Sequence, residues 1–328
     1  MPPCPVASPA PCYSGGLAGR PFQIVSRAGL SWLECSTLAR VPWLLHAFST
    51  RRGGVSRGSA SGLNLGFIAA DRRPNVEENR RRFFARLGAE DFSLATVRQI
   101  HSAQVYQAAR HKSGKLAYFA AGSPLPQPSL PDAPAGDALL TDQPGILLSV
   151  RTADCIPTLL VDPQRRAVAA VHAGWRGGLQ RIVEKTVGVM RATFRSDPRR
   201  MLVAVGPGIR ACCYEVGEEV VAAYCGRFTQ GEQFFRPVAP ASPSKALANR
   251  YPLLFLSPHP PGQEPQPGPA AYLDLAAVVV AQLLAAGLRA RNIAVCDYCT
   301  SCRTDLFFSH RKEGSRTGRM MAVVGIRP

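Results

Sequence analysis

The sequence lacks the features that mark a membrane protein or a disulfide-stabilised secreted domain. No apolar run reaches the length of about 20 residues that a membrane-spanning helix needs, because Arg, Asp or Pro interrupts the best candidates. An apolar secretory signal is also missing. Ten cysteines are present, but their spacing is irregular and Cys212 is adjacent to Cys213, which argues against a disulfide scaffold. We therefore expect reduced thiols, a cytoplasmic location and no membrane partner.

Acidic residues are scarce as well. There are 22 Asp and Glu residues against 39 Lys and Arg residues, which gives a formal net charge of +17. A nucleic-acid-binding protein would gather such basic residues on one face, with aromatic side chains between them. Here the basic residues are scattered, apart from short clusters such as Arg80–Arg82. We expect no nucleic-acid partner, and attribute the charge to the attraction of anionic substrates such as phosphate.

The order of apolar segments predicts an α/β domain. Residues 1–21 are rich in Pro, Gly and Ser, so we expect a disordered extension there, or a segment that directs the chain to an organelle. We expect a single catalytic domain over residues 22–328, with a Pro-rich loop at about residues 236–271. Helical spacing predicts helices at residues 75–87, 178–194 and 273–288. The remaining apolar runs, including neighbouring runs at 137–141 and 146–150 that we expect to pair, predict one large mixed sheet or two packed sheets.

The most informative stretch is a predicted β-hairpin. Two apolar runs, at residues 158–161 and 167–171, flank the turn-forming residues Asp162–Arg165. A four-residue loop at that position places Cys155 opposite His172, with Cβ atoms about 4.5–5.5 Å apart. Such a pair suits either two ligands of one metal ion or a Cys–His catalytic pair.

A third ligand has to come from elsewhere in the chain. Residues 95–108 alternate like a strand that crosses the core, and His101 lies in the middle of them. Two histidines and one cysteine form the ligand set of a catalytic Zn²⁺, which keeps a fourth position for water or substrate. The same donors also suit a single copper ion. Asp154, beside Cys155, is a candidate acid/base group, a candidate for orienting a ligand, or a turn residue.

Two other metal arrangements are disfavoured. Cys296, Cys299 and Cys302 have the spacing that begins an iron–sulfur run, but no fourth cysteine follows. Partly buried thiols are therefore the favoured interpretation of these three residues. None of the six histidines belongs to a His-x-His pair, on which the clusters of four-copper oxidases depend.

Several short motifs together resemble the signature of one family. They are QIHS at Gln99–Ser102, TADC at Thr152–Cys155, VHAGWRG at Val171–Gly177, GPGI at Gly206–Ile209, LDL at Leu273–Leu275 and FSHR at Phe308–Arg311. HAFSTR at His46–Arg51 and NLG at Asn64–Gly66 fit the same signature. The family is that of purine nucleoside phosphorylases formerly called polyphenol oxidase or laccase-domain proteins. The similarity covers about residues 44–326, in the family's order.

The resemblance implies a fold, an activity and a set of site residues. The implied fold is an α/β single domain with mixed β-sheets layered between helices, of the α-β-β-α type. The implied activity is phosphorolysis of adenosine, inosine and methylthioadenosine, with an adenosine deaminase side activity. Zn²⁺ is the expected cofactor, with Cu²⁺ as an alternative, and purine nucleosides and phosphate are the expected partners. The implied metal ligands are His101, Cys155 and His172, and the implied pocket residues are Arg51, Asn64, Arg176 and Arg311.

Other functions remain open at this point. Cys155 and His172 could act without a metal, as the nucleophile and base of a cysteine hydrolase or deamidase. A copper-dependent phenol oxidase and a regulatory partner protein without turnover are further alternatives. The sequence leaves the oligomeric state undetermined.

Overall fold

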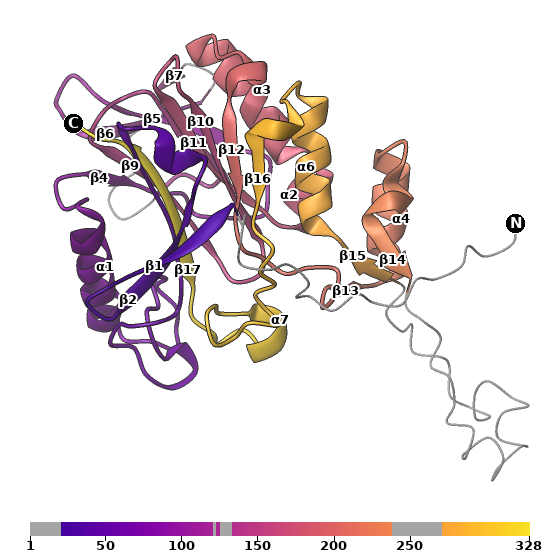
Figure 1. Cartoon of the computed structure of the whole chain (residues 1–328), viewed down its shortest axis with the longest axis horizontal. Coiled ribbons are helices and arrows are strands. Elements are labelled where there is room, and N and C mark those ends of the chain that lie inside the picture. The colour runs from indigo at the N-terminus through magenta and orange to yellow at the C-terminus, as the bar shows by residue number, and fades with distance from the viewer. Residues whose placement is uncertain (1–20, 121–122, 125–132, 238–270) are drawn as a thin grey trace, which may run out of the picture.

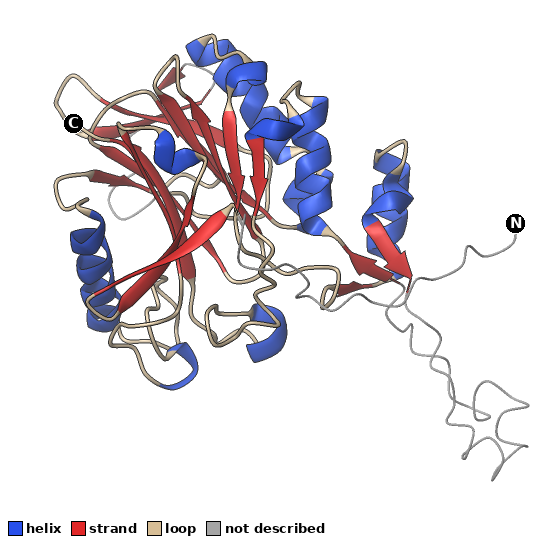
Figure 2. Ribbon diagram, viewed as in Figure 1, coloured by secondary structure: helices blue, strands red, loops and turns tan. Residues whose placement is uncertain are grey.

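Two mixed β-sheets lie face to face at the centre of the molecule, and helices cover their outer faces (Figures 1 and 2). The computed structural model describes residues 21–120, 123–124, 133–237 and 271–328. The expected extension at 1–21 and the expected loop at 236–271 fall almost entirely outside these residues. Among the described residues, no helix has the length and apolarity that a bilayer crossing would require.

The first sheet has six strands and the second has eight. In spatial order the first contains β1 (Phe22–Arg27), β2 (Leu30–Cys35), β3 (Leu44–Ser49), β17 (Met320–Ile326), β9 (Ile146–Thr152) and β4 (Ser93–Ala95). The second contains β16 (Ile293–Val295), β12 (Leu202–Val205), β10 (Ile156–Asp162), β11 (Ala167–Ala173), β8 (Ala138–Thr141), β5 (Val105–Arg110), β6 (Leu116–Ala120) and β7 (Ser123–Pro124). A small third sheet contains β13 (Glu215–Val216), β15 (Ala271–Leu273) and β14 (Phe235–Pro237).

The helices are divided between the two outer faces, as the α-β-β-α expectation requires. Helix α1 (Arg73–Leu87) packs on the six-stranded sheet, while α3 (Ile182–Phe194) and α6 (Leu275–Ala285) pack on the eight-stranded sheet (Figure 1). Within the described residues the remaining α-helices are α2 (Trp175–Leu179), α4 (Glu218–Arg227) and α7 (His310–Glu313).

Strand alternation explains how one strand serves two apolar cores. Along β10, Leu159 and Val161 belong to the core between the two sheets, whereas Leu160 belongs to the core beneath the helices. Successive side chains of a strand point to opposite faces, so a strand buried on both faces needs a continuous apolar run. The sequences of β8 to β11 supply such runs.

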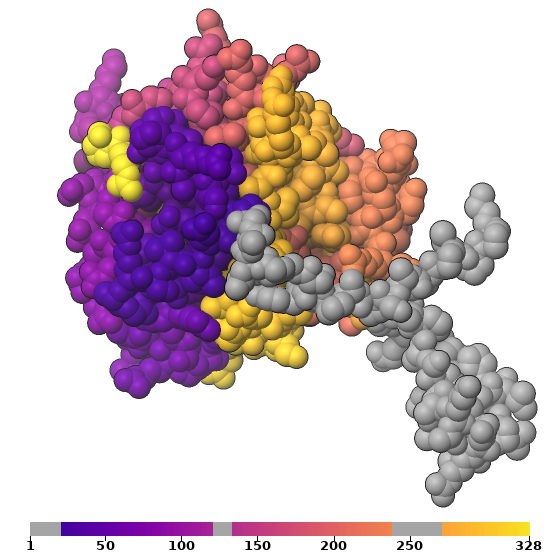
Figure 3. All heavy atoms as spheres, in the orientation of Figure 1, coloured from indigo at the N-terminus to yellow at the C-terminus, as the bar shows by residue number. Residues whose placement is uncertain are grey.

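Segments from the two ends of the described chain lie side by side. β3 pairs antiparallel with β17, and Figure 3 shows the indigo N-terminal part in contact with yellow C-terminal residues on one face. This pairing brings the sequence-distant arginine-rich loops after β3 and before β17 to the same end of the sheets.

Two expectations about local structure were wrong. The runs at 137–141 and 146–150 do not pair, because β8 lies in the eight-stranded sheet and β9 in the six-stranded sheet. Both strands are buried and apolar, so either sheet can accommodate them, and the partner strands come from distant sequence. The helix expected at 178–194 is two helices, α2 and α3, separated at Arg181, whose φ is 59°.

The hairpin register also differs from the expected one. Asp162 pairs with Ala167 and Pro157 with His172, so the residue opposite Cys155 would be Gly174. The carboxylate of Asp162 accepts hydrogen bonds from the backbone N–H groups of Gln164 and Arg165, at 2.9 and 3.1 Å. Arg166 then takes a left-handed φ of 49°. The loop therefore closes one residue later than predicted and shifts every cross-strand pair.

Candidate functional site

The site forms where the chain crosses from one sheet to the other. β9 ends at Thr152 in the six-stranded sheet and β10 begins at Ile156 in the eight-stranded sheet, so residues 153–155 connect them. Within this connection Asp154 has a φ of 92°, which is rare for a residue with a side chain. Strained backbone of this kind clusters at functional sites. Cys155 follows directly and lines the adjoining cavity.

His172 on β11 is held by a buried carboxylate. Its Nδ1 lies 2.8 Å from Oδ1 of Asp137, and Asp137 is fully buried just before β8. A carboxylate accepts a hydrogen bond from Nδ1–H, which fixes the ring and leaves Nε2 as the ligating nitrogen.

His101 lies in the loop between β4 and β5, not within a strand as the alternation predicted. Its φ is 58°, and the same carboxylate of Asp137 holds this loop. The backbone N–H groups of Ile100, His101 and Ser102 donate to Asp137 at 3.3, 3.1 and 2.6 Å. Three successive amides can converge on one side chain only if the backbone turns, which is why this segment leaves the extended conformation. A single aspartate therefore positions both histidines.

The donor atoms of His101, Cys155 and His172 converge. Nε2 of His101 lies 3.8 Å from Sγ of Cys155, and one donor atom from each of the three residues lies within 4.8 Å of the others. The donors of a tetrahedral Zn²⁺, with bonds of about 2.0–2.3 Å, are separated by about 3.3–3.8 Å. Two imidazoles and a thiolate therefore fit one Zn²⁺ or Cu²⁺ ion after small side-chain movements.

A glycine keeps the space between these ligands open. A Cβ atom placed on Gly174 would lie 2.9 Å from Sγ of Cys155 and 2.9 Å from Cδ2 of His101. The smallest substituent at this position would therefore push two of the three candidate ligands apart.

Electrostatics favour a thiolate at Cys155. Burial alone would raise the pKa of Cys155, but the positive charge of His172 and hydrogen bonds with both histidines lower it to about 6. Burial alone would lower the pKa of His172, but the Cys155 thiolate and Asp137 raise it to about 9. Each group thus stabilises the charged form of the other. The thiolate is the form that binds metals and attacks electrophiles.

A cavity of about 560 Å³ adjoins the three residues. This volume lies within the range of about 300–1,000 Å³ that is typical of small-molecule sites. Four arginines line the cavity: Arg151, Arg176, Arg311 and Arg319. Burial lowers the pKa of Arg151, and the neighbouring charge of Arg319 lowers it further. Among the described residues none of the four forms an ion pair, so the cavity wall is suited to an anion.

Six of the residues singled out in the sequence line this cavity. They are His101, Asp154, Cys155, His172, Arg176 and Arg311. Both carboxylate oxygens of Asp154 accept short hydrogen bonds, from Oγ1 of Thr300 and from the backbone N–H of Arg311, each at 2.6 Å. Asp154 therefore links the connection between β9 and β10 to the C-terminal segments that carry Thr300 and Arg311.

Arg51 and Asn64 are not among the residues that line the cavity. Nη1 of Arg51 donates to the carboxylate of Glu313 at 2.6 Å. Asn64 is fully buried, and its Oδ1 accepts from the backbone N–H groups of Gly66 and Arg319 at 3.1 and 2.9 Å. Gly66 and Arg319 both line the cavity, so Asn64 holds the backbone of two lining residues without lining the cavity itself.

The sequence analysis did not assign a role to three of the important residues. Asp137, Arg151 and Arg319 each carry a charge beside or within an apolar, buried strand. A charged residue in an apolar strand is rarely buried without a partner, so its presence there could have marked it as a candidate site residue. It could not indicate which partner each residue would have.

Comparison with known proteins identifies relatives that cover nearly the whole chain. A family model described as multi-copper polyphenol oxidoreductase laccase matches residues 45–327. A protein of Deinococcus radiodurans named purine nucleoside phosphorylase is 37% identical over 298 residues, which is 91% of this chain and 94% of the relative. Adenosine deaminase RL5, from an unknown prokaryotic organism, is 34% identical over 277 residues, covering 84% of this chain and 91% of its own.

The purine nucleoside phosphorylase YlmD of Geobacillus stearothermophilus is similar in both sequence and structure. It is 33% identical over 304 residues, which is 93% of this chain and 97% of YlmD. Its crystal structure superimposes with a TM-score of 0.71 at 32% identity, covering 94% of this chain and all of that chain.

Proposed function

This chain belongs to the family described as multi-copper polyphenol oxidoreductase laccase, and from that premise we propose that it is a metal-dependent purine nucleoside phosphorylase. The proposed substrates are adenosine, inosine and methylthioadenosine together with phosphate, with adenosine deamination as a side activity. The names of its relatives, three phosphorylases or deaminases that cover most of the chain, support a nucleoside-processing enzyme.

One observation carries the proposal. His101, Cys155 and His172 bring three metal-ligating atoms within 4.8 Å of one another at a cavity that four arginines line. Phosphorolysis needs such a combination, because its nucleophile is an anion and its substrate is a small polar molecule. A phenol oxidase acts on a neutral substrate and would not need four guanidinium groups in the cavity wall.

The residues suggest how the reaction is arranged. In phosphorolysis a phosphate oxygen forms a bond to the anomeric carbon of the ribose, and the bond from that carbon to the purine nitrogen breaks with its electron pair leaving on the purine. We propose that Arg319, Arg151, Arg176 and Arg311 hold the phosphate, since a guanidinium group can donate two parallel hydrogen bonds to it. Asp154 would orient Arg311 through its backbone N–H.

The apolar part of the cavity offers a place for the base. Trp175, Ile209, Tyr214 and Leu275 line the same cavity. We propose that the purine packs against these side chains, because a flat heteroaromatic ring gains dispersion and stacking energy there.

His101, Cys155 and His172 are the proposed ligands of Zn²⁺, with Cu²⁺ as the alternative. A bound ion would supply Lewis acidity to the leaving group or to a substrate oxygen. We also propose a reducing, cytoplasmic compartment, because Cys155 must remain a thiolate to serve as a ligand.

The test combines elemental analysis with a phosphate-dependent assay. Purified protein is expected to contain metal and to release hypoxanthine from inosine, and adenine from adenosine, only when phosphate is present. His101→Ala and Cys155→Ala are expected to lose the metal and both the phosphorylase and the deaminase activity. Full turnover by metal-free protein would contradict the proposal, and so would phosphate-independent release of the base.

One observation favours a second candidate function. Cys155, His172 and Asp137 are linked in the order nucleophile, base and orienting carboxylate, and the pKa of Cys155 is lowered to about 6. This arrangement suits a metal-free cysteine hydrolase or deamidase. A chelator would leave such an enzyme active, whereas a thiol alkylator would inactivate it.

A further inference from the structure

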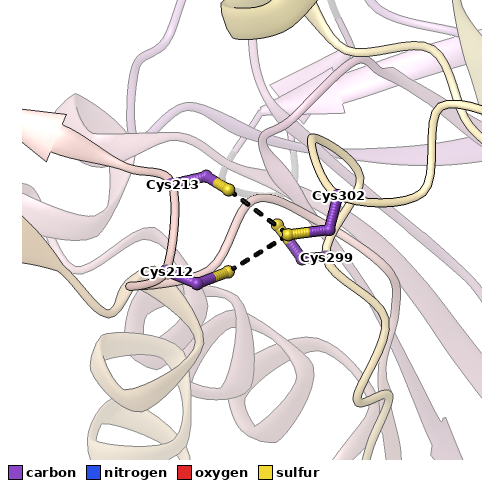
Figure 4. A group of neighbouring side chains, drawn as sticks. All are labelled: Cys212, Cys213, Cys299 and Cys302. Atoms are coloured by element: carbon purple, nitrogen blue, oxygen red, sulfur yellow. Dashed lines mark hydrogen bonds between the residues drawn. The ribbon is translucent and has the colours of Figure 1, made fainter. Parts of the chain in front are cut away.

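Four cysteines that the proposed function does not use form a cluster of their own. Cys212 and Cys213 lie in the loop after β12, and Cys299 and Cys302 lie in the loop after β16. Figure 4 shows the four side chains pointing toward one another from these two loops. Sγ of Cys302 is 3.3 Å from Sγ of Cys213 and 3.6 Å from Sγ of Cys212, and all four sulfur atoms lie within 4.8 Å of one another.

These distances match a single metal ion rather than an iron–sulfur cluster. With metal–sulfur bonds of about 2.3 Å, the sulfur atoms of a tetrahedral tetrathiolate are about 3.8 Å apart. The ligands of an iron–sulfur cluster are farther apart, because several iron atoms lie between them. Four cysteines with no histidine or carboxylate among them are typical of structural Zn²⁺ sites.

We propose that Cys212, Cys213, Cys299 and Cys302 bind one structural Zn²⁺ ion, separate from the ion proposed at His101, Cys155 and His172. On binding, each thiol that is still protonated releases its proton, and each sulfur donates an electron pair to the metal.

The backbone around Cys299 supports a thiolate. The side chain of Cys212 and backbone hydrogen bonds at Ser301, Cys302 and Arg210 surround the sulfur of Cys299. Backbone N–H groups that donate to a ligand sulfur are a common feature of sites that hold metal thiolates.

The charge of Arg210 supports the same interpretation. Nε and Nη2 of Arg210 are buried and have no hydrogen-bond partner among the described residues. Zn²⁺ with four thiolates carries a net charge of −2, and the partly buried cation of Arg210 in the same loop would compensate part of it. Leaving two buried nitrogens of a cation without hydrogen bonds or a nearby negative charge would be costly.

The proposed ion would fasten two loops that form one wall of the cavity. Gly208 and Cys299 form a β-bridge, and the backbone N–H of Thr300 donates to the carbonyl of Gly208 at 3.1 Å. From the same loops Ile209 and Tyr214 line the cavity, and Thr300 holds Asp154 through its hydroxyl. We therefore assign the tetrathiolate a positioning role for Asp154 and Tyr214.

The test is the zinc content of the full chain, purified without added metal. If both sites bind Zn²⁺, the wild-type protein is expected to carry two equivalents and Cys302→Ser one. Cys155→Ser is expected to lose the other equivalent and to keep the tetrathiolate ion. Cys225→Ser removes an exposed cysteine outside the cluster and serves as the matched control, with unchanged zinc content.

The variants separate the two proposals. If Cys302→Ser keeps the wild-type zinc content, the tetrathiolate site is wrong. If Cys155→Ser keeps it, the metal-dependent function is wrong and the tetrathiolate site is unaffected. A chelator is expected to lower the melting temperature of Cys155→Ser, which keeps only the tetrathiolate ion, by roughly 5–15 °C through loss of that ion.

A measurement on the wild-type protein covers the case in which Cys302→Ser does not fold. Native protein is treated with a thiol alkylator before and after addition of a chelator, and the modified cysteines are mapped by mass spectrometry. We expect Cys212, Cys213, Cys299 and Cys302 to be protected together and to become reactive together once the metal is removed. A disulfide between Cys302 and Cys212 or Cys213 in the native protein would overturn the proposal.

Discussion

Oδ1 of Asp137 and Nδ1 of His172 lie 2.8 Å apart, and the same carboxylate receives three backbone N–H groups from the loop that carries His101. One buried side chain thus determines the positions of two of the three candidate metal ligands.

Asp137→Asn is expected to weaken metal binding by about 10–100-fold, because the amide accepts a weaker hydrogen bond from Nδ1–H of His172 and can present its N–H₂ group to the loop instead. The affinity is measured by competition with a chromophoric chelator. Asp142→Asn makes the same exchange at an exposed position just beyond β8 and should leave the affinity unchanged. Equal affinities for both variants and the wild type would show that Asp137 does not orient the ligands.

Gly174→Ala is expected to lower metal affinity and turnover by roughly 10–100-fold, because the added Cβ forces Cys155 and His101 apart at a cost of about 1–3 kcal/mol. Chelator competition and initial rates measure the two effects. The control is Gly188→Ala in α3, where an added Cβ meets no atom within 4 Å. That variant should be fully active, and more stable by up to about 1 kcal/mol, since glycine is unfavourable inside a helix. Full metal binding by Gly174→Ala would contradict the proposed ligand geometry.

Arg319→Gln is expected to raise the KM for phosphate by roughly 10–100-fold, since a hydrogen bond to a charged group contributes about 1.5–3 kcal/mol. The thermal stabilisation by inorganic phosphate should fall in parallel. Arg316→Gln makes the same exchange three residues earlier at an exposed position and should behave like the wild type. If Arg319→Gln alters only the KM for the nucleoside, the arginines do not bind the phosphate.

The stability of the protein is expected to fall below neutral pH because of His46. Burial lowers the pKa of His46 to about 4, against 6.5 as the ordinary value, and its Nε2 accepts the backbone N–H of Cys35 at 3.0 Å. The unfolded chain therefore binds a proton at a higher pH than the folded one. The free energy of unfolding contributed by this group is fully present above pH 6.5 and is lost as the pH falls towards 4.

His46 alone should lower the free energy of unfolding by about 2 kcal/mol between pH 7 and pH 5. Urea unfolding of metal-free protein at both pH values measures it. His46→Gln should reduce this pH dependence, whereas His111→Gln, which removes an exposed histidine, should retain it. Identical pH dependence in the wild type and His46→Gln would exclude His46 as the cause.

The fold class and the identity of the ligands could be predicted from the sequence, but their local geometry could not. Apolar runs identified β10 and β11, and the motifs around His101, Cys155 and His172 singled out the residues that converge in the structure. The hairpin register was wrong by two residues, because the Asp162 side chain and the left-handed Arg166 decide where the loop closes. His101 was placed in a strand because alternation does not reveal the three amides that turn toward Asp137.

The sequence by itself determined which segments are apolar on one face or two, and which residue types are available for chemistry. Only the tertiary structure decided which of them meet. No fourth cysteine follows Cys296, Cys299 and Cys302 in the sequence. In the fold, Cys212 and Cys213 lie beside Cys299 and Cys302, although they come from a loop almost ninety positions earlier. Asp137 likewise accepts hydrogen bonds from the ring of His172 and from the backbone of His101, which lie on different segments. Such contacts depend on how strands are ordered in the sheets, and that order is set by the packing of the whole chain rather than by any local pattern.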